Sequence, residues 1–399
     1  MKINILDLFA GCGGFSNGFE KAGFNILGAN DILLHAANTY KKNHKKTEFI
    51  LGDITKGEVK KKLIDLAKKN KCQIIIGGPP CQAYSMAGAR NVDDPRGKLF
   101  NDYLDMVNSI KPKIFIMENV KGLLSMKHDK QDGLSEDDVK KLDKLKKLEN
   151  EKNFLLLKRK QSLNTKSVKF DNTDQKRLKI ISDQILLFKE NFQNLRVPVL
   201  DTLKKEFEKI GYHIQIKLLN SANFGVPQKR ERVIIFGGFK NTGIKFPDES
   251  HSETQNEDKN LKLFDKTKKD WVTVKDAIDD LKNKKEDILF SHIFNKNSSS
   301  FVEKIKKTPI GKSLYKNFSD AYFRCHPDKP SKTVKENHGG VFIHYEKDRF
   351  LTPRELARLQ SFDDKFLFEG NKSQILVQIG NAVPPKLGLA LAKQTAELL

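Results

Sequence analysis

Short apolar runs alternate with amphipathic segments along the first 125 residues, which is the pattern of a parallel α/β sheet. The alternation predicts a strand at Ile3–Phe9 followed by a helix at Gly13–Ala22. It continues with predicted strands at 25–29, 48–51, 73–76 and 114–117 and predicted helices at 33–43, 59–69 and 99–110. The alternation therefore predicts an α/β fold with a doubly wound sheet, and ligands of such sheets bind beyond the carboxyl ends of the strands.

Residues 125–195 interrupt this alternation. Leucines recur among lysines around position 145, and Ile and Leu recur again from Ile180 to Phe188, which predicts two amphipathic helices joined by a polar loop. Regular α/β alternation resumes with a helix at Val199–Ile210, and strands follow at 213–219 and 232–236. A further helix is predicted at Trp271–Leu281. We interpret 125–195 as a helical insertion.

The chain carries a large positive charge, since Lys and Arg number 73 against 51 for Asp and Glu, a formal net charge of +22. The excess is spread along the chain and is densest around Gln228–Arg232, so the folded body and not a basic tail would meet an anionic partner. A generally lysine-rich proteome would give the same balance. We expect a soluble, cytoplasmic protein, because no long apolar run and no signal-peptide pattern is present.

The 4 cysteines are too scattered for a disulfide framework, and none forms a CxxC pair. The 9 histidines include no HExxH pair or cluster at helical spacing. We therefore expect no catalytic metal.

A glycine-rich turn, Phe9-Ala10-Gly11-Cys12-Gly13-Gly14, follows the first strand and opens the first helix. Such a turn lets the backbone approach a nucleotide-like ligand closely. Asp31 ends the second predicted strand, where a carboxylate can accept ribose hydroxyls, and Asp53 ends the third, where it can accept an adenine amino group. A dehydrogenase would use the same elements, so these residues alone leave hydride and methyl transfer open.

Cys81 follows a rigid Gly-Gly-Pro-Pro turn at the end of a strand, where a thiol can be exposed and activated. Most free cysteines are small buried hydrophobes, but this turn favours a functional thiol. Glu118 ends the next strand and would reach the same edge, where a protonated carboxyl could engage a ring nitrogen. Arg230 and Arg232 alternate along a strand and could anchor a phosphate or hold Glu118; a solvent-facing basic strand is the alternative.

These residues and further segments resemble the DNA (cytosine-5) methyltransferases in the order in which that family has them. The matching segments are Phe9–Gly14, Asp31, Gly52–Ile54, Pro79–Gln82, Arg96–Phe100, Glu118–Val120, Gln228–Arg232, Arg354–Gln360 and Gln378–Pro385. So many ordered blocks do not arise by chance. The resemblance implies a Rossmann-like S-adenosylmethionine-dependent methyltransferase domain and a smaller DNA target-recognition domain.

The resemblance also implies roles for individual residues. Cys81 is the expected nucleophile, Glu118 the residue that engages cytosine N3, and Arg230 and Arg232 the supports of the catalytic site. The S-adenosylmethionine pocket is expected to be lined by Phe9, Gly11, Gly13, Asp31, Ile32, Asp53, Ile54, Leu99, Asn381 and Val383. The residues expected to contact DNA are Gln82, Ser85, Arg96, Gln228, Arg324, Thr333 and Lys335, as base-reading or phosphate contacts.

We therefore expect methyl transfer from S-adenosylmethionine to C5 of a cytosine flipped out of a short specific sequence in double-stranded DNA. The catalytic domain would comprise 1–281 and 377–399, and the target-recognition domain 282–376. Resemblance alone suggests a companion restriction endonuclease, and we expect a monomer that does not bind membranes. Two alternatives stay open: a transfer-RNA cytosine-5 methyltransferase, and a non-catalytic DNA-binding protein on the same fold.

Overall fold

The computed structural model describes residues 2–80, 99–130, 133–164, 168–239, 242–253, 268–316, 321–336 and 342–399. The chain forms two compact units. One unit contains Met1–Pro79, Asp105–Asn119 and Tyr212–Leu399, and the other contains Pro80–Leu104 and Val120–Gly211.

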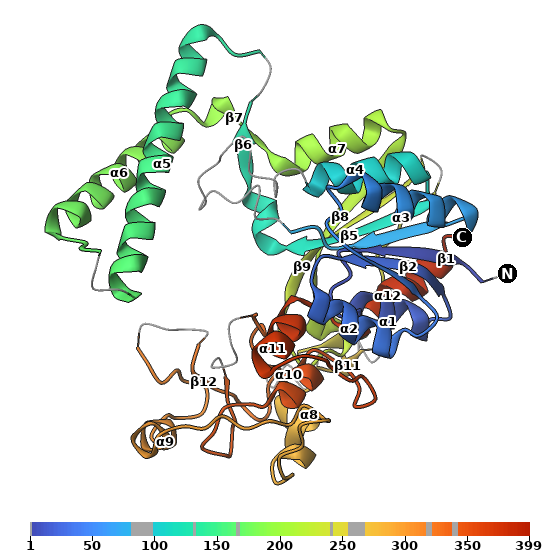
Figure 1. The fold of residues 1–399 in the computed structure, drawn as a ribbon, viewed down its shortest axis with the longest axis vertical. Coiled ribbons are helices and arrows are strands. Elements are labelled where there is room, and N and C mark those ends of the chain that lie inside the picture. The colour runs from blue at the N-terminus through green and yellow to red at the C-terminus, as the bar shows by residue number, and fades with distance from the viewer. Residues whose placement is uncertain are drawn as a thin grey trace, which may run out of the picture. The chain divides into compact units, whose positions relative to one another are not determined.

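A seven-stranded sheet with the order β3-β2-β1-β4-β5-β9-β8 forms the centre of the first unit (Figure 1). Strands β1 to β5 are paired in parallel, and β8 runs antiparallel to β9. The strands are β1 Asn4–Leu8, β2 Asn25–Asp31, β3 Glu48–Leu51, β4 Ile74–Gly77, β5 Ile114–Val120, β8 Tyr212–Asn220 and β9 Glu231–Phe239. This confirms the predicted α/β class. The short, continuously apolar β4 is fully buried, as expected for a parallel strand covered on both faces.

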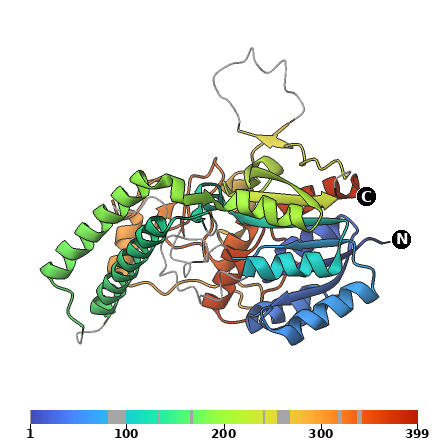
Figure 2. The same cartoon turned by 90° about the horizontal axis from the view of Figure 1, so that it is seen from above.

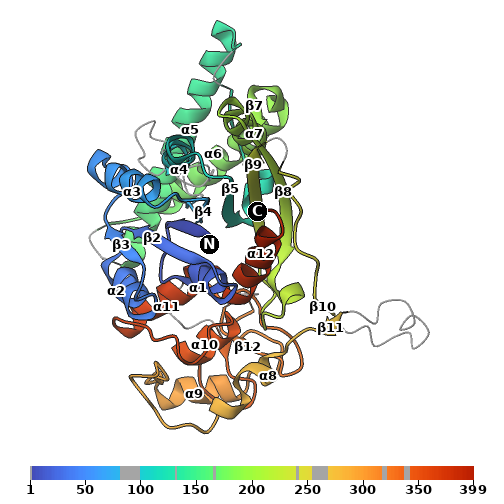
Figure 3. The ribbon, with the colours of Figure 1, turned by 90° about the vertical axis from the view of Figure 1, so that its right-hand side faces the viewer.

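Helices cover the sheet of this unit on both faces (Figures 1 and 3). On one face α1 (Gly14–Lys21) and α12 (Pro385–Ala396) pack together, and Phe15, Phe19, Leu387 and Leu391 join the sheet side chains in one apolar core. The other helices of this part are α2 (Leu34–Asn43), α3 (Gly57–Lys69) and α4 (Leu99–Ile110), which starts in the second unit. The final helix thus completes the layer begun by the first.

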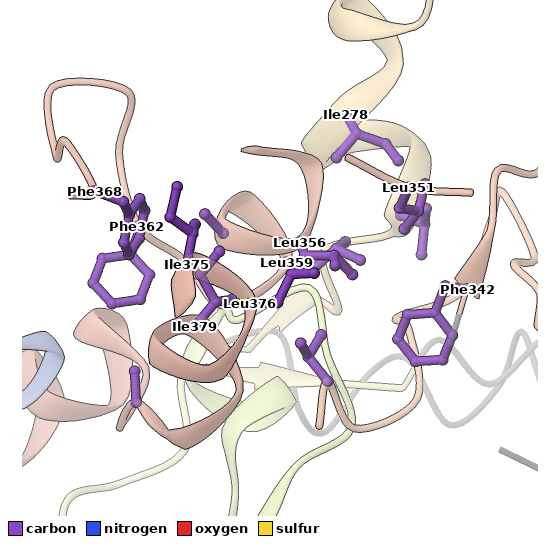
Figure 4. Close-up of a cluster of buried hydrophobic side chains, with 14 of the residues drawn as sticks. Ile278, Phe342, Leu351, Leu356, Leu359, Phe362, Phe368, Ile375, Leu376 and Ile379 are labelled. Carbon is purple, nitrogen blue, oxygen red and sulfur yellow. The ribbon is translucent and has the colours of Figure 1, made fainter. Parts of the chain in front are cut away.

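The chain from 242 onward belongs to the same compact unit; its regular structure is sparse up to residue 352 and mainly helical after it. It contains β10 (His251–Ser252), β11 (Lys269–Asp270), α8 (Val274–Ile278), α9 (Ser299–Lys306), β12 (Phe323–Arg324), β13 (Phe342–Ile343), α10 (Pro353–Leu359) and α11 (Lys372–Asn381). One apolar cluster joins Ile278, Phe342, Leu356 and Ile379 (Figure 4), and Cys12 of the β1–α1 turn is part of it. The region from 282 to 376 therefore shares its core with the β1–α1 turn, and the expected domain boundary stays a prediction.

The second unit contains the predicted helical insertion. Helix α5 (Glu136–Asn164) and α6 (Asn172–Asn191) pack side by side (Figure 2), and a short antiparallel pair, β6 (Lys127–Asp129) and β7 (Arg196–Pro198), closes their base before α7 (Val199–Lys209). Leu145, Leu155, Ile181, Ile185 and Phe188 form the core of the hairpin. The two predicted amphipathic helices are confirmed.

The helix expected at Trp271–Leu281 is shorter than predicted. Thr273 caps α8 by accepting the N–H of Asp276, whose carboxyl accepts the N–H of Thr273 in return, so the helix begins only at Val274. After Ile278 the chain tightens into a 3₁₀ turn at Asp279–Leu281.

Lys372–Ala396 is the one stretch in the described part of the chain that is long and apolar enough to cross a membrane. It consists of α11 and α12, and most of it is buried inside the first unit. Core helices of soluble proteins have the same composition.

Candidate functional site

The turn between β1 and α1 has a strained backbone. Phe9 has a φ of 56° and Gly11 a φ of 54°, and a left-handed conformation costs a non-glycine residue such as Phe9 roughly 1 kcal/mol. Two backbone hydrogen bonds hold the turn, from Ala10 N to Asn30 O at 2.9 Å and from Gly13 N to Ala10 O at 2.9 Å. A Cβ added at Gly11 would meet no atom within 4 Å. The turn therefore borders open space at Gly11.

Asp31 connects this turn to the end of β2. Its Oδ2 accepts the N–H of Gly11 at 2.8 Å, and its Oδ1 accepts the N–H of Leu33 at 2.9 Å. Burial raises the pKa of this carboxyl above its ordinary value, against the effect of those N–H donors. Each oxygen retains acceptor capacity for a hydroxyl, and the neighbouring Ile32 is 61% exposed, so an apolar surface lies beside the acceptors.

Asp53 lies just after β3, and its Oδ1 accepts the N–H of Thr55 at 2.9 Å. The buried side chain of Asn30 holds this end of the sheet by donating to Ile50 O at 2.8 Å and Gly52 O at 3.0 Å. Ile54 is buried. Asp53 is thus fixed in a local turn at the same strand ends as Asp31.

The C-terminal segment that carries Asn381 and Val383 lies against the start of α1. A Cβ added at Gly14 would come within 2.4 Å of Val383 O, which shows how closely the two backbones approach. Asn381 is exposed and Val383 is buried. Leu99, the first residue of α4, belongs to the second unit, so its expected cofactor contact stays a prediction.

Glu118 lies near the end of β5 and pairs with Arg232 of β9, with Oε1 and Nε 2.7 Å apart. Both side chains are largely buried. The other oxygen, Oε2, lies against Gly78, where an added Cβ would come within 3.3 Å of it. Asn119 donates from Nδ2 to Pro79 O at 3.0 Å and so fixes the chain two residues before Cys81. Cys81 itself lies outside the described residues.

The three cysteines in the described part of the chain do not suit nucleophilic chemistry. Burial raises the pKa of Cys12, Cys72 and Cys325 to about 12 in each case. A thiol with such a pKa is almost entirely protonated at neutral pH and is a poor nucleophile. This leaves Cys81 as the candidate.

Arg230 and Arg232 have different partners despite their alternate positions. Arg232 contacts Glu118, whereas Arg230 is 2% exposed and donates to main-chain carbonyl oxygens of Val334, Gly380 and Ala382. Arg230 therefore connects chain segments and does not contact Glu118 directly. If Arg230 supports the catalytic site, it does so indirectly, by holding the segments that contain Val334, Gly380 and Ala382.

The residues expected to contact DNA have varied surroundings. Gln82, Ser85 and Arg96 lie outside the described residues. Arg324 is 5% exposed and donates to Ile305 O, His344 O and the carboxylate of Asp348, so its guanidinium is engaged within its own region and is not presented to a base.

The remaining three residues are Gln228, Thr333 and Lys335, and hydrogen bonds join the segment of Gln228 to the segment of the other two. Gln228 is fully buried and hydrogen-bonded within the protein, which does not suit a base contact. Thr333 is half-buried and donates to Lys229 O at 2.9 Å, and Lys335 is exposed.

Sequence reasoning missed a buried polar group beneath the β1–α1 turn. Asp7 is 1% exposed, Ser16 Oγ donates to its Oδ2 at 2.6 Å, and the same hydroxyl lies 2.7 Å from Tyr40 Oη. Burial, with a smaller contribution from Asp31, raises the pKa of Asp7 to about 7. An acid between the leucines of a buried strand was the signal that could have identified it.

This pKa predicts how stability depends on pH. An acid whose pKa rises from 3.8 to about 7 on folding binds more protons in the native state, so its contribution to stability falls as pH rises through that window. For one proton, the free energy of unfolding falls by at most about 1.4 kcal/mol per pH unit. We expect Asp7→Asn to remove this dependence on pH. Urea unfolding of both proteins between about pH 4.5 and pH 7 measures it; parallel pH profiles would contradict the assignment.

The parallel sheet, the open glycine turn and the acidic residues after β2 and β3 define a Rossmann-like nucleotide-binding domain. The family model for C-5 cytosine-specific DNA methylases matches residues 3–158 and 176–397, so this chain belongs to that family.

Similar proteins agree with this family. The chain is 31% identical to the type II methyltransferase M1.HphI of Haemophilus parahaemolyticus, over 100% of this chain and 88% of the relative. It is 32% identical to M.NgoFVII of Neisseria gonorrhoeae, over 98% of this chain and 86% of the relative. An E. coli prophage protein assigned as a DNA modification methyltransferase has the same fold, with a TM-score of 0.63 and 22% identity, covering 100% of this chain and 99% of that one. The S. pombe Dnmt2 methyltransferase shares the fold at a TM-score of 0.54 and 16% identity, covering 100% and 98%.

S-adenosylmethionine is the methyl donor of this family, and the residues in place fit it. The open space beside Gly11 leaves room for the ligand, Asp31 offers acceptors suited to ribose hydroxyls, and exposed Ile32 offers an apolar surface suited to an adenine ring. The described residues contain no group of three or more His, Cys, Asp or Glu that could hold a metal ion.

Proposed function

We propose that this protein methylates C5 of cytosine within a short specific sequence of double-stranded DNA, as the modification enzyme of a type II restriction-modification system. The observation that carries the proposal is the Arg232–Glu118 pair, whose second carboxyl oxygen faces Gly78, three residues before Cys81. Family membership and two relatives named type II methyltransferases support it.

In the proposed mechanism the Cys81 thiolate adds to C6 of a flipped-out cytosine, and Glu118 donates a hydrogen bond or a proton to N3, which makes the ring an electron sink. Bound S-adenosylmethionine supplies the methyl group as an electrophilic carbon. The electron pair at C5 would form the new C–C bond while the bond between the methyl carbon and the sulfonium sulfur breaks and S-adenosylhomocysteine leaves. A base would then remove the C5 proton, the pair from the C5–H bond would re-form the C5–C6 double bond and expel Cys81 as a thiolate, and any proton given to N3 would return to Glu118. Arg232 holds one Glu118 oxygen at 2.7 Å and leaves the other for the base.

DNA is the partner that this reading requires, and the net charge of +22 provides long-range attraction to its phosphates. We assign sequence recognition to residues 282–376, in particular to the segment Thr333–Gly340 and to Lys335. We further propose a monomeric cytoplasmic enzyme whose companion restriction endonuclease cleaves the same sequence when it is unmethylated. Arg324 and Gln228 are not assigned to base reading, because both are buried.

The direct test measures transfer of labelled methyl groups from S-adenosylmethionine to duplex DNA and to transfer RNA in parallel, with Cys81→Ser as the inactive control. We expect labelling of the duplex alone, and bisulfite sequencing of the product then gives the target. Labelling of RNA alone would support the transfer-RNA alternative. Binding of duplex DNA without any transfer would support a non-catalytic DNA-binding protein.

A further inference from the structure

Three chain segments that are far apart in sequence meet beside the start of β9. They are 227–230, 331–336 and 379–382, and we call this meeting place the junction. The first segment leads into Arg232 and its contact with Glu118. The second, 331–336, includes the first residues of the segment Thr333–Gly340, to which we assign sequence recognition. The third contains Asn381, an expected cofactor residue.

The first and second segments are joined by main-chain and side-chain bonds. Ser331 N donates to Pro227 O at 3.0 Å, Lys229 N donates to Ser331 O at 2.8 Å, and Thr333 Oγ1 donates to Lys229 O at 2.9 Å. The segment 331–334 therefore runs along 227–230 as a short irregular ladder.

Both backbone polar groups of Val334, its N–H and its carbonyl, are hydrogen-bonded to side chains of the first segment. Its N–H donates to Gln228 Oε1 at 2.8 Å, and its carbonyl accepts from Arg230 Nη1 at 2.8 Å. Gln228 is itself fixed by donating to Gln360 Oε1 at 3.0 Å, and Gln360 donates to Ile379 O at 2.7 Å. This chain of amides reaches the third segment by a route independent of Arg230.

Arg230 joins all three segments directly. Its Nη2 donates to Gly380 O at 2.9 Å and to Ala382 O at 3.2 Å, while its Nη1 holds Val334. No carboxylate in the described part of the chain forms an ion pair with this guanidinium, so carbonyl dipoles provide its main compensation. Losing any one of them would leave a buried charge poorly satisfied, which costs more than an ordinary hydrogen bond.

The second and third segments also touch directly. A Cβ at Gly380 would come within 2.3 Å of Glu336 N and 2.4 Å of Lys335 C, so the backbone of 335–336 lies directly on this glycine. Contact this close leaves no room for the backbone of 335–336 to shift toward Gly380 without displacing it. A movement of 333–336 toward this segment would therefore displace the residues on either side of Asn381.

We propose that the junction, centred on Arg230 and Gln228, couples recognition of the target sequence to cofactor binding, so that cognate DNA strengthens cofactor binding and the cofactor strengthens cognate binding equally. The inference rests on the proposed function, because it requires 333–340 to read DNA. Arg230 is then a positioning residue that acts through the segments it holds. Linkage makes the effect reciprocal and measurable at equilibrium.

The test is the affinity of the wild-type enzyme for S-adenosylhomocysteine, measured by calorimetry with a saturating cognate duplex and with a saturating duplex of scrambled sequence. We expect the cognate duplex to tighten binding about 10-fold, within the usual range of coupling between sites. Arg230→Met should reduce the ratio to about 2, because it removes the direct bonds between the three segments and leaves only the amide route through Gln228 and Gln360. Thr333→Val, a half-buried and milder change, should reduce it about 2- to 3-fold, as one hydrogen bond of the ladder is lost.

Thr242→Val is the matched control, because its hydroxyl donates to Phe239 O at 2.7 Å at the opposite end of β9. This variant should keep the wild-type ratio. If Thr333→Val folds and also keeps the wild-type ratio, or if the wild-type ratio itself is 1 in an enzyme that methylates DNA, the coupling is refuted. Absence of methyl transfer to DNA by the wild type would instead refute the proposed function.

Discussion

Replacing Cys81 by Ser is expected to lower methyl transfer to duplex DNA by roughly 10⁴-fold or more, the scale on which enzymes respond to loss of their nucleophile. A serine hydroxyl is hardly ionised at neutral pH, and the other cysteines in the described residues have their pKa raised to about 12 by burial, so none can substitute. Single-turnover transfer of labelled methyl groups measures the rate.

The covalent step has its own readout. With 5-fluorocytosine at the target, C5 holds fluorine in place of the proton that must leave, so the wild-type enzyme should remain bound to the duplex after denaturation. Cys81→Ser should give no such complex, whereas Cys72→Ser should behave as wild type. A stable complex with Cys81→Ser would show that another group attacks C6.

Glu118→Gln is expected to lower methyl transfer by about 10²- to 10⁴-fold, the usual contribution of a positioned acid or base. Glutamine keeps the volume and can still accept a hydrogen bond from Arg232 through its amide oxygen, but it cannot protonate a ring nitrogen. The rate constant of the chemical step should therefore fall while the melting temperature and the affinity for S-adenosylhomocysteine change little.

The control for this substitution is Glu48→Gln, on the exposed part of β3, which should leave the rate unchanged. An equal loss in both variants would indicate a general effect of charge. A wild-type rate in Glu118→Gln would remove Glu118 from the reaction.

The alternation of strands and helices was predictable because buried parallel strands are continuously apolar and their helices have one apolar face. Asp31 and Asp53 lie at strand ends for the same reason, so their common edge followed from topology. The insertion was predictable as two helices, but not its turn. Helix α5 runs on to Asn164 through good helix formers, and α6 starts where Asp171 forms a capping box with Asp174.

The different environments of Arg230 and Arg232 were not predictable. Their spacing suggested one shared face, yet the partners of Arg230 lie 104, 150 and 152 residues away in the sequence. Only the folded chain shows that three carbonyls surround one guanidinium while Glu118 meets the other. The burial of Arg324 has the same origin, since its partners Ile305, His344 and Asp348 are brought together by tertiary packing.

The apolar cluster of Figure 4 limits how specificity can be exchanged between relatives. It joins Val274 and Ile278, before the expected recognition domain, to Phe342 and Leu351 within it and Ile379 after it. A chimaera spliced at 282 and 376 would pair two halves of a core from different parents, and close-packed interiors tolerate such mismatches poorly. Grafts of shorter surface segments that leave this cluster with one parent should yield folded enzymes with new targets more often.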